Sequence, residues 1–129
     1  MNGKVLLDTN IVIALFASET SVIQTLKNAK EVFLSSIVLG ELYYGVYKST
    51  NVEQNLLRID DLSKIITVLS CDSTTAELYG RIKNKLREKG RPIPENDIWI
   101  SALCKQYNLT LVTRDQHFEE VEDIFIERW

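Results

Sequence analysis

The chain has 129 residues, of which 45% are hydrophobic and 26% charged, and its formal net charge is −3. A chain of this length and composition forms one soluble globular domain, residues 1–129, which can bury its own core without disulfides or a structural metal. No apolar run reaches the length of a membrane span and no signal peptide precedes Asp8, so we expect a cytoplasmic protein without a membrane partner.

The chain begins with a strand followed by a helix. The apolar run at residues 5–7 has no polar alternation, which is typical of a strand buried on both faces in a parallel sheet. A helix is expected at residues 11–16, with Thr9 and Asn10 as a tight turn before it. The pattern then predicts, in order, a helix at 21–30, a strand at 32–34 and helices at 37–48 and 51–62.

The second half of the chain continues this alternation. The β-branched run at residues 65–69 is the strongest strand signal in the chain. Asp72 or Ser73 should cap a long helix that reaches about Lys89 and ends at Gly90. A stiff proline loop follows, then a helix at 97–107, a strand at 109–112, a short helix or turn at 115–121 and a strand at 124–126. Strands that alternate with helices indicate an α/β domain with three α/β/α layers and a mostly parallel central sheet.

Asp8 follows the first strand directly. At the carboxyl edge of an open α/β sheet a carboxylate borders the crevice in which ligands bind. An equally good interpretation of the residue alone is a cap for the following helix.

Three further acids have comparable positions. Asp115 follows the strand at 109–112, although an aspartate there can simply form a turn. Asp97 opens a helix, where an acid also complements the helix dipole. Glu41 lies on the apolar side of the helix at 37–48, where a buried charge needs a compensating cation or donor, such as a paired arginine.

The four acids are more informative together than separately. In a parallel sheet their positions can converge at one edge, where several carboxylates repel one another unless cations neutralise them. Oxygen ligands without histidine or cysteine favour Mg²⁺ or Mn²⁺, and such ions support phosphodiester hydrolysis. We therefore expect Asp8, Asp97 and Asp115 to hold the metal and Glu41 to orient metal or water.

Other residues carry weaker indications. The helix near residues 79–91 is basic, and Arg81, Lys85 and Lys89 are spaced by four, so they either follow an RNA backbone or form a solvated face.

The single histidine, His117, lacks a serine or cysteine partner motif and is interpreted as a surface or packing residue. Cys71 and Cys104 are interpreted as reduced core thiols. A strip of tyrosines, Tyr43, Tyr44 and Tyr47, could be core, a protein interface or a platform for base stacking, and the first two are favoured.

The segments around the acids resemble those of the PIN-domain ribonucleases, most closely the VapC-type toxins of type II toxin–antitoxin systems. The matching segments occur in family order: Leu-Asp-Thr-Asn at residues 7–10, residues 39–45 around Glu41, residues 96–102 around Asp97 and residues 111–118 around Asp115. Together they cover nearly the whole chain.

This resemblance implies a Mg²⁺- or Mn²⁺-dependent endoribonuclease that inhibits translation by cutting tRNA or rRNA. It assigns Asp8, Glu41, Asp97 and Asp115 to the acidic site, with Thr9, Asn10 and Thr113 as supporting residues. It also implies a homodimer neutralised by a VapB-like antitoxin that inserts a basic side chain among the acids. For the antitoxin groove we expect Leu42, Tyr43, Val46 and Tyr47, and for RNA contacts Arg81, Lys85, Lys89 and Arg114.

Two alternatives remain at the level of sequence. The same acids occur in DNA or flap nucleases, although this chain is short for the arches and clamps of such enzymes. A non-catalytic metal- or RNA-binding PIN module is the other alternative, and the complete acid set argues against it. A receiver-like domain would instead take up phosphate on Asp8.

Overall fold

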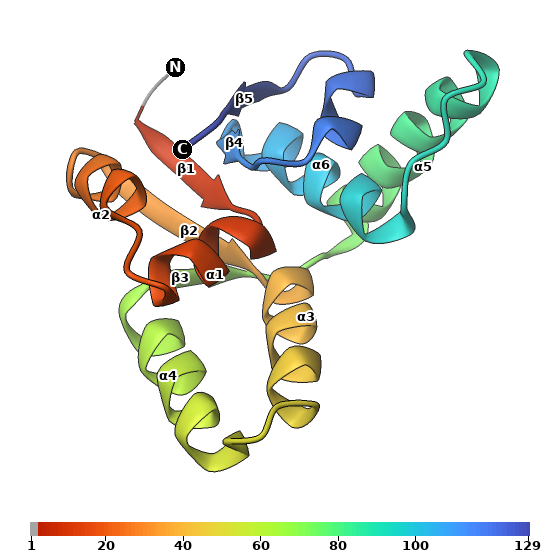
Figure 1. Cartoon of the computed structure of the whole chain (residues 1–129). Coiled ribbons are helices and arrows are strands. Elements are labelled where there is room, and N and C mark those ends of the chain that lie inside the picture. Colours follow the sequence, from red (N-terminus) through yellow and green to blue (C-terminus); the bar gives the residue numbers. More distant parts are fainter. Residues whose placement is uncertain (1–2) are drawn as a thin grey trace.

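The computed structural model describes residues 3–129 and has at its centre a five-stranded parallel sheet in the order β3-β2-β1-β4-β5 (Figure 1). The strands are β1 (Lys4–Leu7), β2 (Glu31–Ser35), β3 (Thr67–Leu69), β4 (Thr110–Val112) and β5 (Phe125–Glu127). The central position of β1 explains its unbroken apolar run, because Val5, Leu6 and Leu7 must be buried on both faces.

Helices connect the strands and cover both faces of the sheet. They are α1 (Thr9–Phe16), α2 (Thr20–Lys27), α3 (Ser36–Tyr47), α4 (Val52–Ile65), α5 (Ser73–Glu88), α6 (Glu95–Tyr107) and the 3₁₀ helix η1 (Gln116–Glu120). No single helix in residues 3–129 combines the length and apolar character needed to cross a membrane; only α1 and α2 taken together meet those criteria, and they are bent by 108°.

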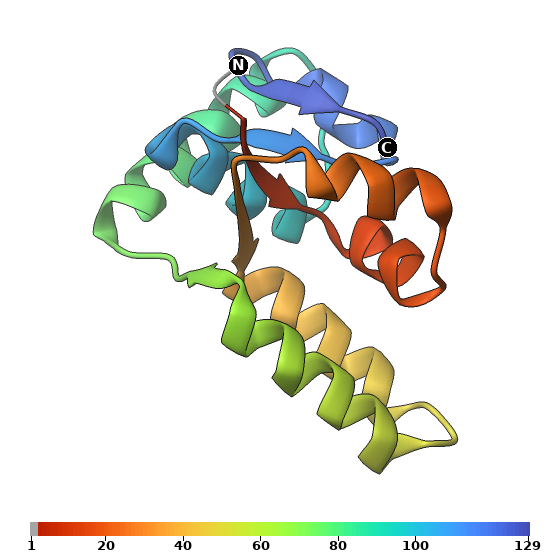
Figure 2. The same cartoon turned by 90° about the vertical axis from the view of Figure 1, so that its left-hand side faces the viewer.

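The order in which the chain visits the strands determines which face of the sheet each helix covers. The chain moves outward from β1 through β2 to β3, then returns to β4 on the other side of β1 and continues to β5. Because crossovers between parallel strands are right-handed, the helices of the first half cover one face, and α5, α6 and η1 cover the other (Figures 1 and 2). The strand order reverses between β1 and β4, which makes the carboxyl ends of these two strands the expected ligand site.

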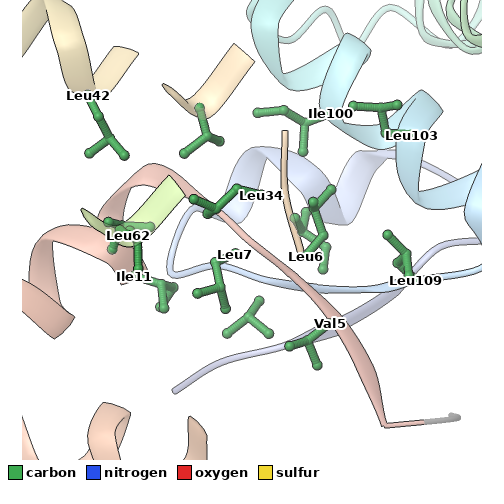
Figure 3. Close-up of a cluster of buried hydrophobic side chains, with 14 of the residues drawn as sticks. Val5, Leu6, Leu7, Ile11, Leu34, Leu42, Leu62, Ile100, Leu103 and Leu109 are labelled. Atoms are coloured by element: carbon green, nitrogen blue, oxygen red, sulfur yellow. The ribbon is translucent and has the colours of Figure 1, made fainter. Parts of the chain in front are cut away.

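Two apolar clusters hold the layers together. The larger one lies around β1, where Leu7 lies beside Ile11 and Leu6 lies toward Ile100 (Figure 3). The smaller one joins α5, α6 and the segment after η1, and consists of Ile82, Leu86, Ile98, Ala102 and Val121. Helices α3 and α4 form a hairpin that extends beyond the sheet (Figure 2).

The α/β/α prediction is confirmed, and the differences from it are local. Thr9 and Asn10 do not form a turn, because Asp8 caps α1 directly and the helix begins at Thr9. Strand β3 is shorter than the run at 65–69, because α4 continues through exposed Ile65 and only Thr67–Leu69 pair with β2. Cys104 is buried as expected, but Cys71 lies exposed in the connection between β3 and α5 and is not a core residue.

Candidate active site

Asp8 lies at the carboxyl end of β1 and is 5% exposed. Its backbone N–H donates to the carbonyl of Val112 at 2.9 Å, which extends the pairing of β1 with β4 by one residue. Its Oδ1 accepts a hydrogen bond from the backbone N–H of Thr9 at 2.9 Å and so caps α1. Both sequence interpretations of Asp8 therefore hold, because the cap also fixes the carboxylate at the sheet edge.

The second oxygen of Asp8 is held from β4. The hydroxyl of Thr113 donates to Asp8 Oδ2 at 2.7 Å, and Asn10 Nδ2 lies 3.3 Å from the same oxygen. Asn10 also accepts a hydrogen bond from the backbone N–H of Arg114 at 3.1 Å. Asn10 therefore ties the start of α1 to the turn that follows β4, which is a wider role than holding its own turn.

Burial raises the pKa of Asp8 above its ordinary value, and the charges of Glu41 and Asp115 raise it further. The hydrogen bonds from Thr113 and Thr9 act in the opposite direction because they favour the ionised carboxylate. Asp8 is thus destabilised as an anion by burial and by the other acids.

Glu41 reaches the same edge from α3. Its Oε1 accepts a hydrogen bond from the Thr9 hydroxyl at 2.7 Å, and Asn96 Nδ2 lies 3.5 Å from Oε2. The partners of this half-buried carboxylate are therefore neutral donors, and no arginine pairs with it among the described residues. An uncompensated acid on an otherwise apolar helix side is explained by a site and not by packing.

Asp97 is the third residue of α6 and does not cap it, since the helix begins two residues earlier than expected, at Glu95. The side chain lies against that of His117, with Asp97 Oδ2 at 3.3 Å from His117 Nδ1. Burial and then the charges of Asp8 and Asp115 raise the pKa of Asp97 from 3.8 to about 6, although the hydrogen bond with His117 lowers it. This coupling brings α6 into the same acidic cluster as β1.

Asp115 follows β4, where its Oδ1 accepts the backbone N–H of His117 at 2.9 Å and caps η1. The expected turn role is therefore present too. The same oxygen lies 3.0 Å from His117 Nδ1. One ligand atom from each of Asp97, Asp115 and His117 lies within 4.8 Å of the other two, a spacing at which they could hold one metal ion.

His117 is exposed, as the sequence interpretation of a surface residue expects, but the sequence did not predict its contacts with the acids. Its side chain is exposed on one side, but its Nδ1 joins the two aspartates. The spacing of Asp115 and His117 is the signal that could have found it, because an aspartate that accepts the N–H two residues later turns the chain back on itself. The donor set also contains one nitrogen and is not purely oxygen. The carboxylates that surround it still suit Mg²⁺ or Mn²⁺.

The residues expected to contact RNA are distributed differently. Arg81, Lys85 and Lys89 lie on α5 and just after it, where they pair with Glu77, Glu122 and Glu120. Arg114 adjoins Asp115, but its guanidinium pairs with Glu19 and donates to the carbonyl of Trp129 at 2.9 Å. Only Arg114 of these four adjoins an acid of the cluster in sequence.

A groove of about 260 Å³ lies between α1, α3 and α4, and Glu41 is part of its lining. Leu42 and Val46 line it, together with Ile13, Phe16 and Arg58. Of the other two residues expected there, Tyr43 donates to Asp60 at 2.7 Å and Tyr47 is exposed, and neither is part of its lining.

Comparison with known proteins agrees with the geometry. The family model of the PIN domain matches residues 5–124. Among curated proteins, ribonuclease VapC2 of Haemophilus influenzae is 37% identical and the tRNA(fMet)-specific endonuclease VapC of Shigella flexneri 33% identical, each over 98% of both chains.

Solved structures give the same result. The chain superposes on VapBC2 of Rickettsia felis, bound to a DNA fragment from its promoter, with a TM-score of 0.90 and 30% identity over 98% of both chains. VapBC-1 of nontypeable Haemophilus influenzae gives a TM-score of 0.89 and 30% identity over the same share of each chain. With a matching family model, sequence and fold, the chain belongs to the PIN-domain family and is a relative of the VapC ribonucleases.

Proposed function

We propose that this protein is the toxin of a type II toxin–antitoxin system and acts as a metal-dependent endoribonuclease on tRNA or rRNA. The observation that carries the proposal is the convergence of Asp8, Glu41, Asp97 and Asp115 from four separate elements at the point where the strand order of the sheet reverses. Relatives named as ribonucleases over nearly their full length support the same activity.

The residues present fit a divalent cation. The pKa of buried Asp8 and Asp97 is raised partly because the acids repel one another, and a bound cation would remove that repulsion. We assign Asp8, Asp97 and Asp115 as the ligands of Mg²⁺ or Mn²⁺, with His117 holding the two aspartates from the open side. When bound, such an ion lowers the pKa of water and stabilises the charge that develops on the leaving oxygen.

The remaining polar residues act by position. Thr113 and the backbone of Thr9 fix both oxygens of Asp8, so this carboxylate cannot rotate away from the site. Glu41 has one oxygen held by Thr9, and its other oxygen can accept a hydrogen bond from the attacking water and orient it. Related nucleases lead us to expect a 5′-phosphate and a 3′-hydroxyl on the products.

We further propose that a VapB-like antitoxin occupies the groove between α1, α3 and α4. The groove is mostly apolar and has Glu41 in its lining, so a peptide that fills it could place a basic side chain beside this acid. Structural neighbours solved as VapBC complexes support this partner. A homodimer and action in the cytoplasm, where the proposed substrate lies, stay predictions.

The direct test is to incubate the purified protein with total tRNA and with rRNA, with Mg²⁺, with Mn²⁺ or with chelator. We expect discrete fragments in the presence of metal, none with chelator and none from an Asp8→Asn variant. Absence of cleavage of every RNA by antitoxin-free, metal-supplied protein would overturn the nuclease assignment and favour a binding module. Cleavage of duplex DNA in preference to RNA would favour the DNA nuclease.

A further inference from the structure

A polar hollow of about 340 Å³ adjoins the acidic cluster. Residues 90–93, in the loop after α5, form one wall, and Gln116, His117 and Glu120 of η1 form the other. His117 belongs to both places, because its Nδ1 contacts Asp97 and Asp115 while the residue also lines the hollow. A chain of nucleotides that lies across the acids could therefore continue into this hollow.

The loop contributes one uncommitted cation to the hollow. Four of the six basic residues in the segment 79–91 form ion pairs with glutamates: Arg81, Lys83, Lys85 and Lys89. Arg87 instead donates to Asn84 at 2.9 Å. Within residues 3–129 the guanidinium of Arg91 has no hydrogen bond or ion pair. Glu120, the acid in the opposite wall, is already bridged by Lys89, so it does not neutralise Arg91.

The backbone that carries Arg91 is fixed. Gly90 has a φ of +66°, its N–H donates to Arg87 at 3.1 Å, and the N–H of Arg91 donates to Leu86 at 3.0 Å. These bonds form the left-handed glycine cap that ends many helices. Pro92 restricts the backbone of Arg91 further, and Ile93 packs onto the smaller apolar cluster. Arg91 is thus held beside the hollow before any ligand arrives.

We propose that Arg91 binds an RNA phosphate adjacent to the scissile one and that the hollow receives the corresponding nucleotide. This inference rests on the proposed nuclease function and assigns Arg91 as a positioning residue of that site. A guanidinium suits the role because it donates two parallel hydrogen bonds to a phosphate and stays charged at any physiological pH. The net charge of the protein is negative and repels RNA. An unpaired cation next to the site would therefore help to attract the RNA backbone.

The test compares Arg91→Ala with Arg87→Ala in steady-state cleavage of bulk tRNA with Mn²⁺. Arg87 is a matched control, because it has the same charge near the same helix end but lines the neighbouring cavity without His117. We expect Arg91→Ala to raise KM by roughly 10-fold with kcat changed by less than about 2-fold, and Arg91→Lys to recover part of the loss. Arg87→Ala should behave as wild type, and circular dichroism should show all three variants folded.

A binding measurement separates a phosphate contact from other effects. With Asp8→Asn in both proteins to prevent cleavage, Arg91→Ala should reduce the slope of log Kd for tRNA against log salt by about 0.7, the value for one contact to a single-stranded phosphate. An unchanged slope and KM in a folded, otherwise active enzyme would overturn the inference and leave the nuclease function standing. Equal losses in Arg91→Ala and Arg87→Ala would also overturn it, because they would show only bulk charge. If the wild type cleaves no RNA, the nuclease function fails and the inference fails with it.

Discussion

The hydroxyl of Thr113 donates a 2.7 Å hydrogen bond to Oδ2 of Asp8, across 105 positions of sequence and between the ends of two adjacent strands. Both residues are buried, so the bond operates where water does not compete with it. It lowers the pKa of Asp8, whereas burial and the acidic neighbours raise it. The end of β4 therefore supports the acid at the end of β1.

Replacing Thr113 by valine removes this donor and keeps the shape of the side chain. We expect kcat/KM for tRNA cleavage to fall about 10-fold and the free energy of unfolding to fall by about 2 kcal/mol, since Asp8 loses a hydrogen bond to a charged group. Thr113→Ser keeps the hydroxyl and is the matched control. Equal activity of the valine and serine variants would show that the bond does not matter for Asp8.

Asp8→Asn tests the central acid itself. The amide cannot supply a charged ligand, so we expect cleavage to fall at least about 100-fold, whereas the melting temperature stays the same or rises because repulsion among the acids decreases. Cleavage assays and thermal denaturation on the same preparation check both parts. Asparagine can still cap α1, so loss of activity accompanied by unfolding would mean that the fold needs the second carboxylate oxygen, which accepts the hydrogen bond from Thr113.

The raised pKa of Asp97 predicts how the stability of the metal-free protein depends on pH. In the folded chain the pKa is about 6, against 3.8 for the ordinary group, so the folded state binds the proton more tightly. Stability is therefore favoured at pH 3.8 and below and is lost as the pH rises toward 6, by up to about 3 kcal/mol in total. Urea unfolding in chelator between pH 4.5 and 7.5 measures this loss, and Asp97→Asn should flatten the curve. A wild-type curve as flat as that of the variant would contradict the assignment.

Metal binding should oppose that loss. At neutral pH we expect Mn²⁺ to raise the melting temperature of the wild type, because a ligand that binds only the folded state stabilises it by mass action. Asp97→Asn should abolish most of the shift. Asp61→Asn, on the exposed side of α4, removes the same charge away from the cluster and should leave the shift intact.

The groove between α1, α3 and α4 predicts that binding of the antitoxin can be lost while the fold is kept. Ile13 lines the groove and is 57% exposed, so Ile13→Asp should leave the fold intact while placing a charge where an apolar side chain has to dock. Cells that co-express wild-type toxin with the antitoxin from the neighbouring reading frame should grow, and those with Ile13→Asp should not. Ile65→Asp changes a still more exposed isoleucine, at 82%, that lies outside the groove, and this variant should still be neutralised.

The sequence predicted the layers and the four acids because both depend on local patterns. Unbroken apolar runs identify buried parallel strands, and acids directly after such runs occupy the edge of the sheet. The contact of Asn96 with Glu41 was missed because it depends on how α6 approaches α3, and that of His117 with Asp97 because it depends on how η1 approaches α6. The spacing of Asp115 and His117 indicates only the local turn. The length of strand β3 was predicted too long from a local pattern. The β-branched run is present, but its first residue belongs to the end of α4 and only Thr67–Leu69 pair with β2.

Helix α6 lies between the two apolar clusters, with Ile100 and Leu103 in the larger and Ile98 and Ala102 in the smaller. Its amide hydrogens should therefore exchange with solvent only when the whole domain unfolds, whereas α5, which contributes only to the smaller cluster, can open on its own. Asp97 sits in the first turn of the slower helix. A local opening of α5 would thus detach the helix that carries Arg81 and Lys85 while the acidic cluster stays in place.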